Sequence, residues 1–211
     1  MGRAPSLCGV ILAAGESSRM GTDKALLPWP PGESQQTFLS ASIRLLNGFN
    51  DMVIVVVGNN EASLAPAVYA TSAMLVRNPA PERGQLSSLQ VGLEEVLNQG
   101  RDAAMITLVD RPPVTTATVK FLTSAFEAAL LREKWAVVPE YQGKHGHPIL
   151  ADREMIEAFL RAPVSSSARE VEHQNEAHIQ YVPVDDPYVA ANVNTPQEYA
   201  ALAGMPGART K

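Results

Sequence analysis

Short runs of apolar residues alternate along the chain with longer stretches in which apolar residues recur every three or four positions. The short runs predict buried strands at residues 7–14, 52–57, 74–76, 103–109, 135–139 and 179–183. The periodic stretches predict amphipathic helices at residues 37–48, 61–70, 85–98, 116–132, 153–160 and after Pro196. Residues 28–32, 143–148 and 165–167 are predicted as loops. This alternation is typical of an α/β fold in which helices cover both faces of a mostly parallel sheet.

Length, charge and cysteine content limit what such a fold can be. The 211 residues show neither an internal repeat nor a linker, so we expect a single domain over residues 1–211 with a core from Leu7 to Leu202 and a frayed tail over residues 204–211. The formal charge of −5 argues against a nucleic-acid binder, which would carry a basic face. Cys8 stands alone in the first strand, so no internal disulfide can form. No apolar run has the length of a membrane span and no signal peptide is evident, from which we expect a cytoplasmic protein.

A polar loop follows the first predicted strand and carries the strongest chemical signal. It contains hydroxyls, cations and glycines, at Gly15, Ser17, Ser18, Arg19, Gly21 and Lys24. The end of the first parallel strand is where doubly wound sheets bind ligands. Backbone N–H groups, a guanidinium fork and an ammonium group suit a polyphosphate, so the loop predicts a nucleoside-triphosphate site. The alternative is a small, basic, solvated loop. The spacing of the glycines and Lys24 in the polar loop excludes both a Walker A loop and a dinucleotide fingerprint.

Asp110 follows the predicted strand at residues 103–109. A carboxylate in this position can hold a hard divalent cation such as Mg²⁺ against phosphate oxygens. The alternative role, an N-cap for the helix near Thr115, is disfavoured because two prolines intervene.

The sequence at residues 12–24 resembles the signature Leu-Ala-Ala-Gly-x-Ser-x-Arg-Met-Gly-x-x-Lys of the MobA-like nucleotidyltransferases. The resemblance implies a Rossmann-like three-layer sandwich with a mostly parallel sheet, of the nucleotide-diphospho-sugar transferase type. It also implies nucleotide contacts at Leu12, Ala13, Ala14, Gly15, Ser17, Arg19, Gly21 and Lys24.

Three further elements match the same family in its order. Gly84 and Ser88 belong to a Gly-x-x-x-Ser-Leu-x-x-Gly element and are expected to contact the nucleoside, as is Asn78 in the preceding turn. The alternative for Ser88 is a helix cap. A Gly-His-Pro element at residues 146–148 suggests that His147 and Lys144 line the acceptor side, with Arg169 as a further candidate. The alternative for these three is an ordinary polar surface.

The last element is Asn-x-Asn-Thr-Pro at residues 192–196. Thr195 and Pro196 suit the start of a helix, but a helix start does not account for Asn192 and Asn194. Guanylyl-transferring relatives tend to carry asparagines here and cytidylyl-transferring relatives aspartates. An amide oxygen can still coordinate Mg²⁺, so Asn194 is a second candidate metal ligand beside Asp110.

The implied reaction transfers a nucleoside monophosphate from an NTP to a phosphorylated pterin-type acceptor, molybdopterin or the molybdenum cofactor, and releases pyrophosphate. Arg19, Lys24 and Asp110 are the implied catalytic residues. Ala14, where guanylyl relatives have glycine, favours CTP, and His147 agrees. Asn192 and Asn194 favour GTP, and CTP is the expected nucleotide. A guanylyltransferase, a 4-diphosphocytidyl-methylerythritol-type cytidylyltransferase and a non-catalytic nucleotide sensor or cofactor-delivery protein remain alternatives. A molybdoenzyme or its chaperone is left open as a partner.

Overall fold

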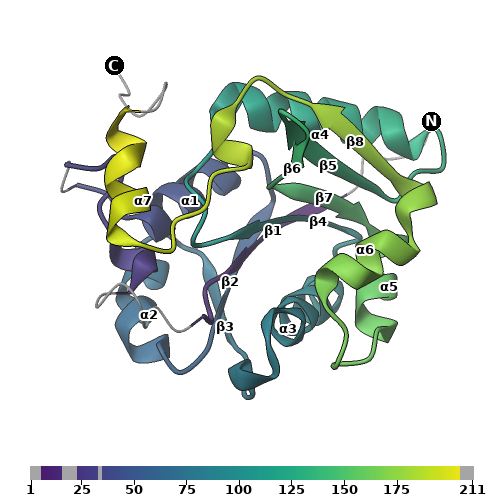
Figure 1. Cartoon of the computed structure of the whole chain (residues 1–211). Helices are drawn as coiled ribbons and strands as arrows, with labels where there is room; N and C mark the ends of the chain where they lie inside the picture. The colour runs from purple at the N-terminus through teal and green to yellow at the C-terminus, as the bar shows by residue number, and fades with distance from the viewer. Residues whose placement is uncertain (1–5, 16–22, 33–34, 205–211) are drawn as a thin grey trace.

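A mixed sheet runs through the molecule with its strands in the order β3-β2-β1-β4-β7-β5-β6, and β8 pairs with β5 (Figure 1). The computed structural model describes residues 6–15, 23–32 and 35–204. Its strands are β1 Leu7–Leu12, β2 Met52–Val57, β3 Met74–Arg77, β4 Ala103–Leu108, β5 Ala136–Tyr141, β6 Lys144–His145, β7 Ile149–Asp152 and β8 Ile179–Pro183. Strands β3, β2, β1 and β4 are mutually parallel, and β8 is parallel to β5. Strand β7 is antiparallel to β4 and β5, and β6 is antiparallel to β5.

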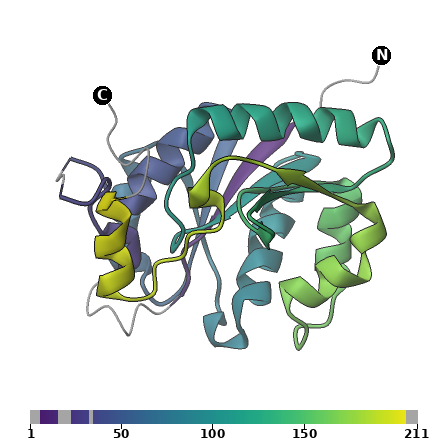
Figure 2. The same cartoon turned by 45° about the horizontal axis from the view of Figure 1, so that its top comes forward.

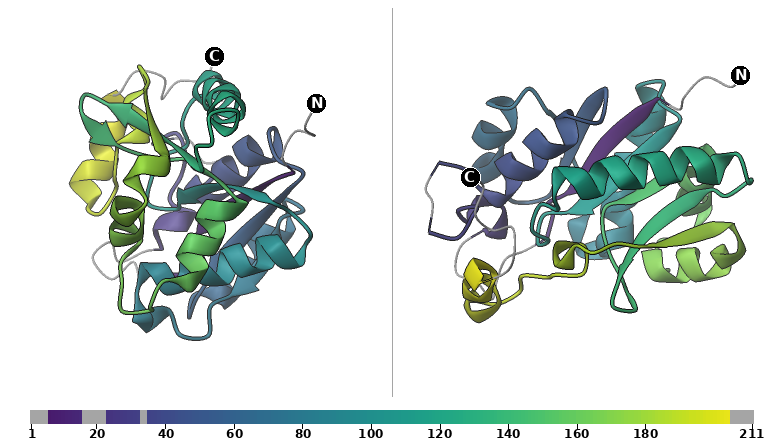
Figure 3. Two further views of the ribbon diagram at one scale, coloured as in Figure 1. Left: turned by 90° about the vertical axis from the view of Figure 1, so that its right-hand side faces the viewer. Right: turned by 90° about the horizontal axis from the view of Figure 1, so that it is seen from above.

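Helices cover both faces of this sheet, which confirms the three-layer sandwich (Figures 2 and 3). The helices are α1 Phe38–Asn47, α2 Glu61–Tyr69, α3 Gln85–Asn98, α4 Thr116–Leu130, α5 Arg153–Arg161, α6 Ala168–Gln174 and α7 Pro196–Ala201. Helices α1, α2 and α4 pack on one face, and α3, α5 and α6 pack on the other. Helix α7 lies near α1, where the rings of Phe38 and Tyr199 are 6.0 Å apart.

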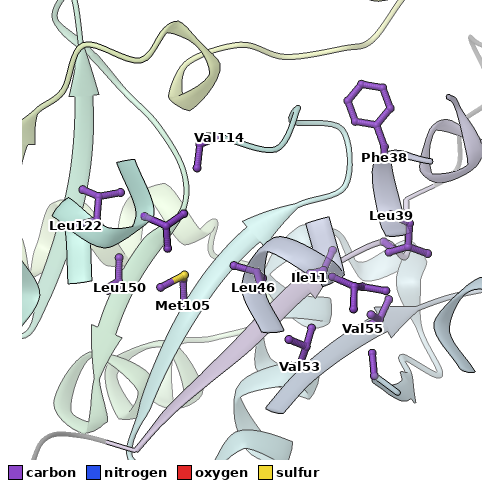
Figure 4. Close-up of a cluster of buried hydrophobic side chains, with 14 of the residues drawn as sticks. Ile11, Phe38, Leu39, Leu46, Val53, Val55, Met105, Val114, Leu122 and Leu150 are labelled. Atoms are coloured by element: carbon purple, nitrogen blue, oxygen red, sulfur yellow. The ribbon is translucent and has the colours of Figure 1, made fainter. Parts of the chain in front are cut away.

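The alternation of side chains along β1 divides the apolar core into two clusters. Leu7 and Ile11 face α1, while Cys8 and Val10 face α3. Figure 4 shows part of the first cluster, in which Ile11 lies with residues of α1 and β2. Burial on both faces explains why β1 reads as a continuous apolar run instead of an alternating one.

Gly92 explains one feature of the Gly-x-x-x-Ser-Leu-x-x-Gly element. A Cβ atom at this position of α3 would lie 2.8 Å from Cγ2 of Val56 and 2.9 Å from Cγ1 of Val10. The missing side chain therefore lets α3 pack closely on β1 and β2, so this glycine serves helix–sheet packing.

The expected elements are present with small shifts at their ends, and the differences lie in the second half of the chain. The stretch at residues 143–148, predicted as a loop, contains the two-residue strand β6, and β7 and α6 were not expected. Residues 28–32 form a loop as predicted, but Trp29 packs on Phe38 at a ring distance of 5.1 Å. The expected fraying falls on residues 204–211, of which residues 205–211 lie outside the described residues. No helix in the described part of the chain combines the length and apolar character needed to span a membrane.

Candidate active site

Two adjoining cavities open at the carboxyl ends of β1 and β4. Strand β2 pairs with one side of β1 and β4 with the other, so this is the topological switch point of the parallel strands. The first cavity has a volume of about 480 Å³ and the second about 580 Å³, in the range of small-molecule sites. They share the lining residues Leu12, Gln85, Leu108 and Arg111. Ligands bound in the two cavities would therefore be neighbours.

The first cavity gathers most of the described residues that were expected to contact a nucleotide. Its lining consists of Leu12, Ala14, Gly15, Lys24, Pro81, Gly84, Gln85, Ser88, Leu108, Val109, Asp110, Arg111 and Asn192. Ala13 and Asn78 are outside this lining. Ser17, Arg19 and Gly21 lie outside the described residues, so their contacts stay predictions.

Asp110 lies two residues after the end of β4, and its side chain is half-buried with Oδ1 shielded from solvent. Its Oδ1 atom has no hydrogen-bond partner among the described residues. Burial raises the pKa of Asp110 above its ordinary value, and the positive charges of Lys24 and Arg111 act in the opposite direction. A buried, unpaired carboxylate oxygen costs folding free energy, which makes this atom a candidate for contact with a ligand or cation.

Lys24 connects the polar loop after β1 to the asparagine segment at residues 192–194. It belongs to a short 3₁₀ turn, Lys24–Leu26, and its Nζ donates to Oδ1 of Asn194 at 2.8 Å. The backbone N–H of Val193 donates to the carbonyl of Asp110 at 2.9 Å, which brings the asparagine segment to the end of β4. The segment ends in α7, where Thr195 and Glu198 form a capping box with Pro196 in the first turn.

The oxygen donors around Asp110 fit a magnesium ion. Asp110 and Asn192 both line the first cavity, and carboxylate and amide oxygens are ligands that Mg²⁺ prefers. The described residues include no cluster of three His, Cys, Asp or Glu side chains that could hold a metal ion alone. A cation here would therefore need water or phosphate oxygens as further ligands. Oδ1 of Asn194 already accepts from Lys24, so its role as a ligand stays a prediction.

Asn60 holds together the two ends of the polar loop. Its Nδ2 donates to the carbonyl of Ala13 at 2.9 Å and to Oδ2 of Asp23 at 2.8 Å. Its Oδ1 accepts from the backbone N–H of Gly58 at 3.1 Å. Asn60 therefore fixes the chain on both sides of the loop relative to β2, although its own position in the sequence predicted no such contact.

Asn78 is held by protein groups, and its expected contact with a ligand stays a prediction. Its side chain is 2% exposed, and its Nδ2 donates to the hydroxyls of Ser87 and Ser88, both at 2.9 Å. Its Oδ1 accepts from the backbone N–H of Ala80 at 2.9 Å. Ser88 lines the first cavity, so Asn78 acts on that cavity through Ser88.

The second cavity contains all three residues expected on the acceptor side. Lys144, His147 and Arg169 line it together with residues of α3, α5 and α6. Lys144 and Arg169 are exposed and supply positive charge at its wall. Burial, aided by the charge of Arg111, lowers the pKa of His147 to about 3. His147 is therefore neutral at physiological pH and can offer a hydrogen bond but no charge.

Several polar residues that line the cavities were missed in the sequence, among them His145 in the second cavity. Gln85 lines both cavities, Glu172 lines the second, and Arg111 stands between them. Burial raises the pKa of Glu172, and Arg169 opposes that shift. In the sequence, only the position of Arg111 next to Asp110 indicated a role in the site. Gln85 and Glu172 fall within helical patterns and carried no signal.

Comparison with known proteins agrees with this geometry. Residues 9–201 match the MobA-like NTP transferase domain. The molybdenum cofactor cytidylyltransferase of Escherichia coli is 27% identical over 192 residues, which cover 90% of this chain and 92% of the relative. A probable molybdenum cofactor guanylyltransferase of Mycobacterium avium is 28% identical over 204 residues, covering 96% of this chain and 98% of the relative.

A solved structure shows the same architecture. The crystal structure of Rv0371c from Mycobacterium tuberculosis superposes with a TM-score of 0.80 at 26% identity, covering 96% of this chain and all of that chain. The family match covers most of the chain, and the described residues Leu12, Ala14, Gly15 and Lys24 of the family signature line the first cavity. The chain belongs to the MobA-like NTP transferase family.

Proposed function

We propose that this protein transfers CMP from CTP to the phosphate group of molybdopterin or the molybdenum cofactor and releases pyrophosphate. The proposal rests on the position and surroundings of the Asp110 carboxylate. Its unpaired carboxylate oxygen lies at the switch point of the sheet, the residue lines the first cavity, and the positive charges of Lys24 and Arg111 act on it. Family membership and the cytidylyl- and guanylyl-transferring relatives support the same type of reaction.

The chemistry needs positioning and charge neutralisation more than a covalent intermediate. A phosphate oxygen of the acceptor forms a bond to the α-phosphorus of CTP while the bond from that phosphorus to the bridging oxygen breaks, and pyrophosphate leaves. Lys24, in the first cavity, and Arg19, in the loop, would stabilise the charge of the departing pyrophosphate. Mg²⁺ held by Asp110, with an amide oxygen of Asn192 or Asn194, would polarise the α-phosphate.

Ala14 supports CTP as the nucleotide. It lies just past β1, is 7% exposed and lines the first cavity, so its methyl group restricts the space there. Asn192 lines the same cavity and supports the second candidate, transfer of GMP from GTP, because guanylyl-transferring relatives tend to carry this asparagine pattern. The two candidates share one chemistry and differ in the base.

A transfer assay tests the proposal. The protein is incubated with molybdopterin, Mg²⁺ and either CTP or GTP, and pyrophosphate and the dinucleotide product are measured. We expect product from CTP, and little product from Asp110→Asn, which keeps the shape of the side chain but removes its charge. Nucleotide binding without pyrophosphate release from either nucleotide would instead support a non-catalytic nucleotide sensor.

A further inference from the structure

Arg111 is the cation at the boundary between the two cavities. It follows Asp110 after the end of β4 and is one of the four residues that line both cavities. The other three, Leu12, Gln85 and Leu108, carry no charge. Arg111 is therefore the charged residue that the linings of the two cavities share.

The side chain is held in place by backbone groups from a distant part of the sequence. Nη1 of Arg111 donates to the carbonyls of Val189 and Ala191, both at 3.3 Å. The carbonyl of Val189 also accepts from the backbone N–H of His147 at 2.9 Å, which ties the arginine to the floor of the second cavity. A guanidinium fixed by two carbonyls loses little further freedom when it binds an anion.

The charge of Arg111 is only partly compensated by the protein. Its two hydrogen-bond acceptors are neutral carbonyls, and its buried Nε has no partner among the described residues. No carboxylate in the described part of the chain forms a salt bridge with it, and Asp110 is the acidic group that acts on its pKa. Burial of a cation without an ion-pair partner is unfavourable, and such groups are typical of sites that receive an anion.

The proposed reaction creates a need for a cation at this boundary. The attacking acceptor phosphate and the α-phosphate of the nucleotide are both anionic and must approach to bonding distance. Building on the proposed function, we propose that Arg111 binds the phosphate of the acceptor and holds it at the boundary of the cavities, against the α-phosphate. The arginine keeps its proton throughout, and the only bonds that change are those at the α-phosphorus.

The rival explanation is that Arg111 only fastens the segment 189–191 to the end of β4. Both roles predict weaker transfer when Arg111 is changed, so the test must separate the two substrates. Arg111→Met removes the charge and keeps much of the length, whereas Arg111→Lys keeps the charge without the planar fork. Arg83→Met is the matched control, because Arg83 is exposed and lines neither cavity.

Steady-state transfer kinetics are measured with molybdopterin varied at saturating CTP and Mg²⁺, together with the Kd of CTP by calorimetry. For Arg111→Met we expect kcat/KM for molybdopterin to fall at least about tenfold, while the Kd of CTP changes less than about threefold. Arg111→Lys should lie between Arg111→Met and the wild type, and Arg83→Met should match the wild type. A parallel loss of CTP and molybdopterin affinity would overturn the proposal in favour of the fastening role, and unchanged kinetics for Arg111→Met would overturn it outright.

A binding measurement separates this proposal from the proposed function. Molybdopterin is titrated into each variant in the presence of a non-hydrolysable CTP analogue. Weaker binding to Arg111→Met than to the wild type supports the acceptor contact, and equal binding contradicts it whether or not transfer occurs. Failure of the wild-type protein to form product from any nucleotide contradicts the proposed function itself.

Discussion

Replacing Asp186 with alanine should destabilise the protein severely. The Asp186 carboxylate is 3% exposed, and its Oδ2 accepts from the backbone N–H of Thr115 at 2.9 Å and from the hydroxyl of Thr118 at 2.6 Å. Its Oδ1 accepts from the backbone N–H of Tyr188 at 3.0 Å. One buried carboxylate thus joins the start of α4 to the short turn Pro187–Val189.

The expected loss follows from the donors that alanine would leave without a partner. Each unpaired buried donor costs about 1–3 kcal/mol. The donors of Thr118 and Tyr188 are buried, whereas that of Thr115 is half-buried and can turn to water, so Asp186→Ala should lower the free energy of unfolding by roughly 3–5 kcal/mol. At about 2–4 °C per kcal/mol for a domain of this size, Tm should fall by roughly 6–20 °C. The side chain of Asp186 also supports the backbone that holds Arg111, so transfer should weaken even well below Tm.

Urea denaturation at neutral pH measures this loss, with Asp185→Ala as the control. Asp185 is exposed and adjacent, so its replacement removes the same charge without these hydrogen bonds. Asp186→Asn should lose less, because its amide retains one acceptor oxygen. If the free energies of unfolding of Asp186→Ala and Asp185→Ala agree within about 1 kcal/mol, the structural reasoning is wrong.

Three further changes test the nucleotide contacts and one titrating group. Arg19→Ala should lower kcat/KM for the nucleotide about tenfold to a hundredfold, because a charge-assisted phosphate contact contributes roughly 1.5–3 kcal/mol. The stability of the protein should change little, and unaltered kinetics would exclude the contact. Ala14→Gly should improve GTP use more than it harms CTP use, because a methyl group in a tight contact costs about 1–3 kcal/mol, and competition kinetics with both nucleotides would detect the shift. Burial raises the pKa of Asp152 from 3.8 to about 6, so the native state binds more protons than the unfolded chain between these values and loses stability there as pH rises. Asp152→Asn, which can still cap α5, should therefore gain stability relative to the wild type from pH 4 to 7, and a difference that does not vary with pH would contradict this.

Local signals were sufficient for most of the fold and insufficient for its later half. Strands β2 and β8 and helix α3 have the predicted bounds, because their apolar runs or periodic faces end at clear turn residues. Strand β7 was missed because only four residues separate the Gly-His-Pro turn from α5, and its last residue is already the α5 N-cap. Helix α6 was missed because Val171 is its single buried residue, too few to give a periodic pattern.

The candidate site likewise contains residues that could be predicted from the sequence and residues that could not. The family signature indicated the residues that line the first cavity from the loop and strand ends, such as Gly15 and Lys24. The role of Asn60 and the placement of Arg111 could not be predicted, because each depends on backbone atoms distant in sequence. The carbonyls that hold Arg111 lie 78 and 80 residues away along the chain. The sequence shows residue types but not which backbone carbonyls a side chain contacts in the fold.

The contact between Lys24 and Asn194 has a consequence for synthesis of the protein. These residues are 170 positions apart, and the hydroxyl of Tyr199 in α7 likewise donates to the carbonyl of Pro28 at 2.8 Å. A nascent chain emerges N-terminus first, so every strand of the described sheet has been translated before the partner of Lys24 is available. A chain that ends before residue 190 contains strands β1 to β8 but lacks Asn192, which lines the first cavity, and Asn194, which accepts from Lys24. The lining of the first cavity is therefore completed only when the last segment of the chain has been synthesised.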